Sequence, residues 1–188
     1  MAPRTTHQQV NVGTGGGGAS GAVSKADGQR MAPGLTSEQV WRALAKASFA
    51  VLGYVTPSGG PRCSGVVYKL VDRRLYTAVA PHSWKARHVP ASGRVAVTVP
   101  VRRGGILSLV APIPPATITF HGAAIVHLAD SPRGASLLKE LGSLIPPERR
   151  VSGSVIEIAP EGEFLTYALG VPLRKMLDPV AALARLPV

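Results

Sequence analysis

Hydrophobic and polar positions along the chain alternate mainly with the two-residue period of β-strands. Segment 94–101 is the clearest example, because Val95, Val97, Val99 and Val101 alternate with other residues and are expected to face one side of a strand. Comparable apolar runs between turn residues predict further strands over 49–56, 62–71, 75–80, 117–128, 154–159 and 164–169.

Helical spacing is confined to a few short segments. Thr36 is predicted to be an N-cap with Gln39 at the capping-box position, and apolar residues follow at helical intervals. A second helix is expected to be ended or kinked by Pro90. This second helix is predicted over 81–92. Two further helices are predicted over 131–144 and 175–186, and the last of them is amphipathic.

Many short strands with few helices indicate an antiparallel barrel rather than alternating β-α units. The turn at 57–60 separates the first two predicted strands. Segment 102–116 contains Pro112, Pro114 and Pro115, which exclude a central strand there. It is therefore predicted to be an apolar flap or an extended loop.

The first 34 residues differ in composition from the rest of the chain. They include the run Gly15 to Gly18 and almost no large apolar side chain, so residues 1–34 are predicted to be a flexible, Gly-rich tail. Residues 35–188 are predicted to form one domain. The start of the chain lacks the apolar region of a signal peptide, and no apolar run approaches about 18 residues. With a single cysteine in addition, we expect a cytoplasmic protein with no membrane partner.

The chain is strongly basic, with 21 Lys and Arg against 10 Asp and Glu and a net charge of +11. This excess favours anionic partners such as a phosphorylated small molecule or nucleic acid, although a GC-rich coding sequence produces a similar composition. Aromatic residues make up only 5% and do not interleave with basic ones. We therefore expect no nucleic-acid partner.

Small donors and cations gather where a predicted strand gives way to a helix. Ser83, Lys85 and Arg87 lie there, and a helix N-terminus with such side chains suits a phosphate. Lys85 is the principal candidate. The alternative is that it is a solvated helix lysine, as most lysines are.

Four segments in this order resemble one known family. They are Pro-Arg-Cys-Ser-Gly-Val-Val-Tyr at 61–68, Arg-Leu-Tyr-Thr-Ala at 74–78, Ser-Trp-Lys-Ala-Arg at 83–87 and the strand at 94–99. The chain is similar to the flavin-binding split β-barrel family, the pyridoxamine-phosphate-oxidase-like proteins and their deazaflavin-dependent relatives. The resemblance is closest over 48–101. It implies a mainly β, antiparallel split barrel with a few short helices.

The resemblance also implies a cofactor, FMN or the deazaflavin coenzyme, and a homodimer whose cofactor sites form between subunits. The residues expected to bind the cofactor are Arg62, Ser64, Gly65, Val66, Tyr76, Thr77, His82, Ser83, Lys85 and Arg87. Arg62, Ser64 and Val66 are expected on one strand face, with the flavin ring running along this strand where Gly65 permits close approach. Core, bulge and sheet-surface roles are the alternatives for the strand residues.

Other reactive or aromatic residues are given structural roles. Cys63 is predicted to be a small buried residue rather than a nucleophile. Trp84 is predicted to anchor its helix rather than to cover the ring. The histidines lack a ligand spacing supported by carboxylates, so no metal is expected, and His82 is a candidate contact for phosphate or ribityl groups.

The function that this resemblance implies is an oxidoreductase that transfers hydride between the bound cofactor and a small organic substrate. No catalytic residue is assigned. The C-terminal arginine motif of the vitamin B6 oxidases is not recognisable, so oxidation of pyridoxamine phosphate is not expected. Arg102, Arg103 and the segment 104–116 are candidates to complete the site of a second subunit. The alternative is a non-catalytic protein for flavin or haem sequestration or redox sensing.

Overall fold

The computed structural model describes residues 34–103, 114–142, 153–176 and 178–188. The predicted tail over 1–34 lies outside the described residues except for Gly34, as does most of the predicted flap over 104–116. The elements in chain order are α1 (Ser37–Lys46), β1 (Phe49–Val55), β2 (Pro61–Val67), β3 (Lys69–Val71), β4 (Arg74–Val79), α2 (Trp84–Ser92), β5 (Arg94–Val101), β6 (Ala116–His127), α3 (Pro132–Glu140), β7 (Ser154–Tyr167), the 3-10 helix η3 (Leu173–Lys175), α4 (Pro179–Ala182) and β8 (Leu183–Pro187).

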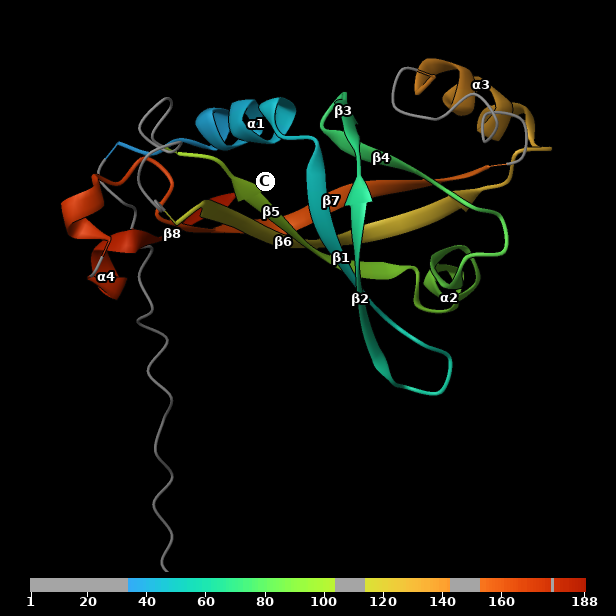
Figure 1. The fold of residues 1–188 in the computed structure, drawn as a ribbon, viewed down its shortest axis with the longest axis horizontal. Coiled ribbons are helices and arrows are strands. Elements are labelled where there is room, and N and C mark those ends of the chain that lie inside the picture. The colour runs from blue at the N-terminus through green and yellow to red at the C-terminus, as the bar shows by residue number, and fades with distance from the viewer. Residues whose placement is uncertain (1–33, 104–113, 143–152, 177) are drawn as a thin grey trace, which may run out of the picture.

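The eight strands form one antiparallel sheet that curls into a barrel (Figure 1). The order is β2-β1-β5-β6-β7-β4-β3, with β8 added on β7. The strands β2 and β3 end this order, yet they are consecutive in the chain and are separated only by Tyr68. The backbone itself therefore joins the two edges of the sheet, and the predicted antiparallel split barrel is confirmed.

The barrel interior is filled from the sheet and from both ends. Helix α1 begins with the predicted capping box at Thr36 and Gln39 and buries Val40, Trp41 and Leu44. At the other end, α2 packs against β1, β5 and β6. Helix α3 instead covers the outer face of β4 and β7. The inner face of the sheet therefore carries the main core, and α3 covers a smaller one.

The predicted strand over 62–71 is wrong as a single element, because it divides at Tyr68. The Tyr68 side chain is buried, and its hydroxyl donates to the carbonyl of Leu44 at 2.7 Å. Its backbone N–H donates to Ser48 O rather than to a neighbour in the β3–β4 ladder. The buried tyrosine thus fixes the point at which the chain crosses from β2 to β3.

Tyr68 also makes stability depend on alkaline pH. Burial raises its pKa well above the usual value near 10, because the charged phenolate is poorly solvated in the core. Its contribution is present below pH of about 10 and is lost as the pH rises toward the folded-state pKa. Tyr68→Phe is expected to cost about 1 kcal/mol at pH 8 and to reduce the further loss above pH 10, measured by urea unfolding. Equal alkaline losses in both proteins would contradict this.

Two further predictions of local structure are wrong at the C-terminal end. The predicted strands 154–159 and 164–169 are one strand, β7, which passes through Gly162 at φ 72° while the register with β6 shifts after Thr119. The predicted helix over 175–186 is correct only over Pro179–Ala182, which form α4, and is wrong from Leu183, where β8 begins, pairs Leu186 with Phe164 and buries alternate residues. Both segments are decided by pairing with distant strands rather than by local period.

The helix predictions need smaller corrections. Pro90 lies inside α2 and does not end it, since the helix continues to Ser92 and stops at Gly93, which has a left-handed φ of 63°. Ser131 caps α3 as predicted, but α3 ends at Glu140. Across the described ranges, no helix has the length and apolar character needed to cross a membrane.

Candidate cofactor site

Strand β2 presents its side chains as the alternation predicts. Val66 is buried in the core, and Ser64 lies two residues earlier on the same face, opposite Leu52 of β1. The Ser64 hydroxyl oxygen is buried and has no hydrogen-bond partner. Because an unsatisfied buried hydroxyl is costly, Ser64 is the residue of β2 that most needs a polar contact.

The opposite face of β2 carries Cys63, Gly65 and Val67. Cys63 is exposed, so the prediction that it is a small buried residue is wrong. A Cβ atom on Gly65 would stand 2.9 Å from the ring of Phe49, so the space above this glycine is filled by Phe49. Gly65 was predicted to let the flavin ring approach closely, but in this structure the Phe49 side chain makes that approach.

The start of α2 holds the predicted cationic cluster. The Ser83 hydroxyl accepts a hydrogen bond from the N–H of Ala86 at 3.3 Å and acts as the N-cap. Lys85 is half-buried, and Arg87 and His82 are exposed. Ser83 therefore already has a structural role, whereas the cations of this turn remain accessible to a ligand.

Trp84 connects α2 with β2. Trp84 was predicted to be a hydrophobic anchor for its helix, but the residue is 55% exposed and so does not anchor the helix in the core. The guanidinium of Arg87 lies 4.3 Å from the ring centroid and that of Arg62 lies 5.9 Å away, both within cation–π range. Because the two arginines come from different elements, the fold assembles an exposed aromatic plane with a cation from each.

A hollow of about 700 Å³ lies beside this plane, between the β1–β2 turn and α2. Arg62, Cys63, Trp84 and His88 line it together with turn residues. The His88 ring packs against Trp84 at 5.0 Å and Tyr54 at 6.2 Å between centroids, and its buried Nδ1 has no hydrogen-bond partner. The hollow thus combines aromatic walls with one cation, and the unsatisfied Nδ1 of His88 is buried.

Tyr76 and Thr77 of β4 point to opposite faces of the sheet. Thr77 lies on the inner face between Leu75 and Val79, and its buried hydroxyl has no partner. Tyr76 packs under α3 in the smaller core. Burial and the nearby Glu157 carboxylate raise the pKa of Tyr76. The two residues therefore do not contact one ligand from the same side.

Glu157 is the centre of a group that sequence reasoning missed. Its carboxylate is bonded to Arg74 at 2.7 Å and to His127 at 2.8 Å on neighbouring strands. Only the cross-strand register brings these residues together, and no local spacing reveals it. By contrast, His88 follows Trp84 by four residues on a predicted helix, so helical spacing could have placed it in the site.

In the part of the chain that the structure describes, no group of three or more His, Cys, Asp or Glu residues is arranged to hold a metal ion. The polar groups of the hollow therefore suit an organic ligand with anionic and aromatic parts better than a bare cation.

The fold places this chain among the split-barrel proteins, which the sequence resemblance predicted. General Stress Protein 26 from Bacillus anthracis str. Sterne matches with a TM-score of 0.52 at 19% identity, over 69% of this chain and 91% of that one. The haem storage protein HutZ from Vibrio cholerae matches with a TM-score of 0.54 at 14% identity, over 68% and 92%.

A FAD-binding protein from Mesorhizobium loti also matches, with a TM-score of 0.50 at 18% identity, over 68% of this chain and 91% of that one. No protein-family model matches the chain, and no curated protein does. At these identities the comparisons establish the fold, and the ligand must be argued from the site.

Proposed function

We propose that this protein binds a flavin-type cofactor, FMN or alternatively the deazaflavin coenzyme, and transfers hydride between it and a small organic substrate. The observation that carries the proposal is the exposed Trp84 plane with Arg62 and Arg87 on it, beside the hollow and the start of α2. A planar cofactor with a phosphate needs both an aromatic surface and fixed cations.

Each residue of the site has a separate task in this proposal. Lys85 and Arg87 bind the phosphate, and Arg62 binds an anionic edge of the ring system. Trp84 packs on the ring and excludes water from one side. Ser64 supplies the hydroxyl that has no partner within the described chain. The bound cofactor supplies the redox chemistry, which no side chain of the site provides.

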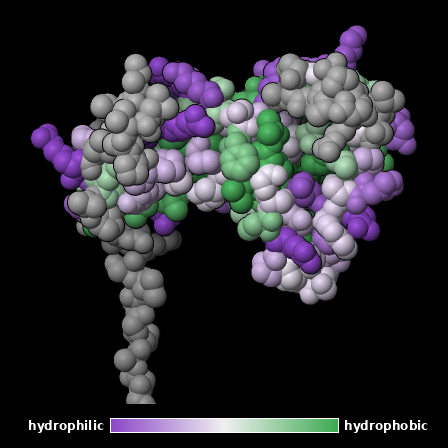
Figure 2. Space-filling model, viewed as in Figure 1, coloured by the Kyte–Doolittle hydropathy of each residue, from purple (hydrophilic) through white to green (hydrophobic). Residues whose placement is uncertain are grey.

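A homodimer belongs to the proposal because one sheet face is apolar and is not covered by any residue that the structure describes. Phe49, Val55 and Val67 lie on the outer face of β1 and β2 and are 45%, 46% and 51% exposed. Figure 2 shows hydrophobic side chains gathered over these strands. Because Cys63 of the same outer face also lines the hollow, a second copy docked there lies next to the site and adds walls to it.

The test is a titration of the full chain with FMN and with the deazaflavin coenzyme, followed by absorbance. One of the two is expected to bind saturably, with one site per chain, and the protein is expected to sediment as a dimer. Lys85→Ala is expected to weaken binding about ten-fold, the loss of one charge-assisted contact. The control is Lys139→Ala, which removes an exposed lysine of α3 far from the hollow. Absence of binding to either cofactor contradicts the proposal.

A second candidate function is non-catalytic binding of haem or flavin. It is supported by the fold shared with the haem storage protein HutZ and by His88, which lines the hollow and whose buried Nδ1 has no partner among the described residues. Haemin added to the same samples distinguishes the two. A Soret shift that saturates at one haem per chain, together with no flavin binding, favours this function. Hydride transfer from reduced cofactor favours the first.

A further inference from the structure

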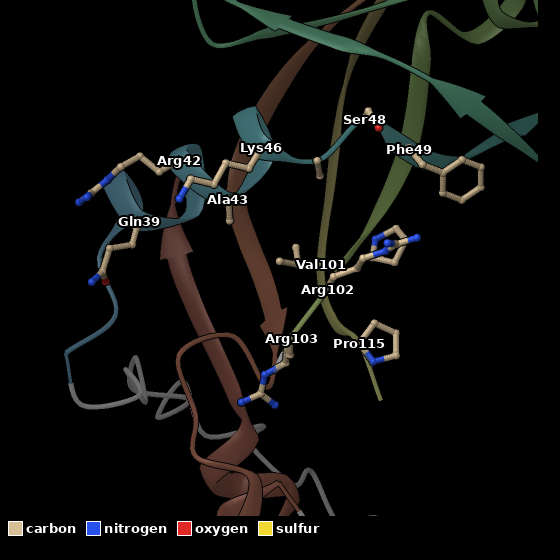
Figure 3. A pocket seen from close by; sticks show the side chains of 12 residues that line it. Gln39, Arg42, Ala43, Lys46, Ser48, Phe49, Val101, Arg102, Arg103 and Pro115 are labelled. Carbon is tan, nitrogen blue, oxygen red and sulfur yellow. The ribbon is translucent and has the colours of Figure 1, made fainter. Parts of the chain in front are cut away.

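Two concave regions of the described surface differ in how they present polar groups. The larger is a cleft of about 1230 Å³ between α1 and the end of β5. Figure 3 shows the side chains of Arg42 and Arg102 extending away from this cleft and from each other, so its cations are not directed at a common ligand. By contrast, the smaller hollow at Trp84 has a polar side chain in its wall, His88, whose ring is fixed by its neighbours.

The His88 ring is held by aromatic residues of two elements. The Trp84 ring, one helical turn earlier in α2, lies 5.0 Å away between centroids, and the Tyr54 ring of β1 lies 6.2 Å away. Tyr54 is buried in the close-packed core, so its ring is not free to move aside. A side chain held in this way loses little further freedom when a ligand binds, which favours a contact of defined direction.

The two nitrogens of the His88 ring have different surroundings. Nδ1 is buried and has no hydrogen-bond partner. Nε2 is not one of the buried atoms that lack a partner, and it makes no hydrogen bond with the described residues. Because His88 lines the hollow, Nε2 is the nitrogen that is open to it. The ring therefore offers a ligand this one nitrogen.

The burial of Nδ1 also determines what Nε2 can do. A neutral imidazole carries its single proton on one of the two nitrogens, which then donates, while the other accepts. Among backbone groups, a buried N–H without an acceptor is rarer than a buried acceptor without a donor, and the same preference applies to this ring. It places the proton of His88 on Nε2. The hollow then receives an N–H donor, and the ligand must supply the acceptor.

The other polar groups of the hollow support an acceptor-rich ligand. Arg62 lines the same hollow, and a guanidinium has five N–H donors and no acceptor. Its central carbon lies 5.9 Å from the Trp84 ring centroid, so Arg62 and His88 both border the aromatic plane. None of the residues that line the hollow carries a carboxylate. A planar ligand with acceptor atoms along one edge therefore matches these groups.

We propose that His88 is a ligand-contacting residue that donates a hydrogen bond from Nε2 to a carbonyl oxygen on the edge of a planar ring bound in the hollow. This inference rests on the proposed function, because the ring of a flavin-type cofactor carries such carbonyl groups, and it adds a neutral contact to the cations already assigned. In the haem alternative, Nε2 would bind the iron through its lone pair, and the proton would lie on the buried Nδ1.

The first test reads the position of the proton without any ligand. The full chain is labelled with nitrogen-15 histidine, and the His88 signals are assigned by their loss in His88→Gln. At about pH 8, where an ordinary histidine is neutral, the NMR shifts are expected to show a protonated Nε2 and an unprotonated Nδ1. A proton on Nδ1 overturns the proposal. Saturation with FMN, or with the deazaflavin coenzyme if only that binds, is expected to shift Nε2 more than Nδ1.

Titrations of variants with the same cofactor test the contact itself. His88→Ala and His88→Asn are expected to weaken binding about ten-fold, whereas His88→Gln keeps an N–H near the position of Nε2 and is expected to weaken it less than about three-fold. Equal weakening by all three would mean that only the packing of the ring matters, and this overturns the proposal. His121→Gln is the matched control, because it changes an exposed histidine of β6 that does not line the hollow.

Failure of this inference can be distinguished from failure of the proposed function. Cofactor binding of equal affinity in the wild type and in His88→Ala overturns the role of His88 and leaves the proposed function in place. Absence of binding of both cofactors to the wild type contradicts the two together.

Discussion

Phe164→Ala is expected to lower the free energy of unfolding by about 4 kcal/mol, the largest effect of any single change considered for this fold. The Phe164 side chain is fully buried and lies edge-on to the rings of Trp41 at 5.0 Å and Phe120 at 5.6 Å. It thereby joins α1 to β6 across the barrel interior. Truncation removes both aromatic contacts and leaves a cavity that rigid strands cannot close.

Leu165→Ala is the matched control for this prediction. Leu165 is the next residue of β7, but it faces outward and is 40% exposed. Its truncation is expected to cost less than about 1 kcal/mol. Urea unfolding of both variants, with unchanged m values, measures the difference. Similar losses in the two would mean that Phe164 does not link α1 to the sheet.

Trp84→Ala is expected to weaken cofactor binding about a hundred-fold, because it removes the aromatic plane and separates Arg62 from Arg87. Replacement by Phe keeps a ring and is expected to weaken binding less than ten-fold. Since Trp84 is 55% exposed, neither variant is expected to change the unfolding free energy by more than about 0.5 kcal/mol. Binding and stability are thus predicted to respond separately.

Flavin absorbance measures the affinity of each variant, because Trp84→Ala lacks the Trp84 emission, and tryptophan fluorescence shows where the flavin binds. The chain has two tryptophans, and Trp41 is only 5% exposed, so the red-shifted emission belongs to Trp84. A bound flavin is expected to quench this emission in the wild type, while the emission of Trp41 in Trp84→Phe is quenched less. Val180→Ala on α4, which removes a side chain that is 59% exposed, serves as the control for loss of an exposed apolar group. Undiminished flavin affinity in Trp84→Ala would remove the observation on which the proposed function rests.

The features that depend on interactions within a few residues could be predicted from the sequence. The caps at Thr36, Ser83 and Ser131 depend on hydrogen bonds within a few residues, and Thr36 and Ser131 were predicted correctly. Ser83 was predicted to bind phosphate, and its role as a cap could have been found from the same spacing. The alternation at Val95, Val97 and Val99 is likewise a local property that predicts which side is buried.

Errors arose where a distant strand decides the outcome. The segment at 183–187 has helical spacing, but pairing with β7 makes it a strand, because the ladder satisfies its backbone and buries Ala184 and Leu186. The exposure of Cys63 follows from the uncovered outer face of β2, which no local pattern reveals. The prediction of two separate strands over 154–159 and 164–169 was also wrong, because β7 continues through Gly162 as one strand.

The sequence by itself therefore determined the antiparallel barrel class, the first helix and the order of basic residues before and within α2. Only the tertiary structure decided which of those residues meet. It brought Arg62 against Trp84 and sent Tyr76 and Thr77 to opposite faces of the sheet. The physical reason is that period and capping act within one turn or strand, whereas these contacts join elements 20 to 60 residues apart and exist only after the sheet has closed.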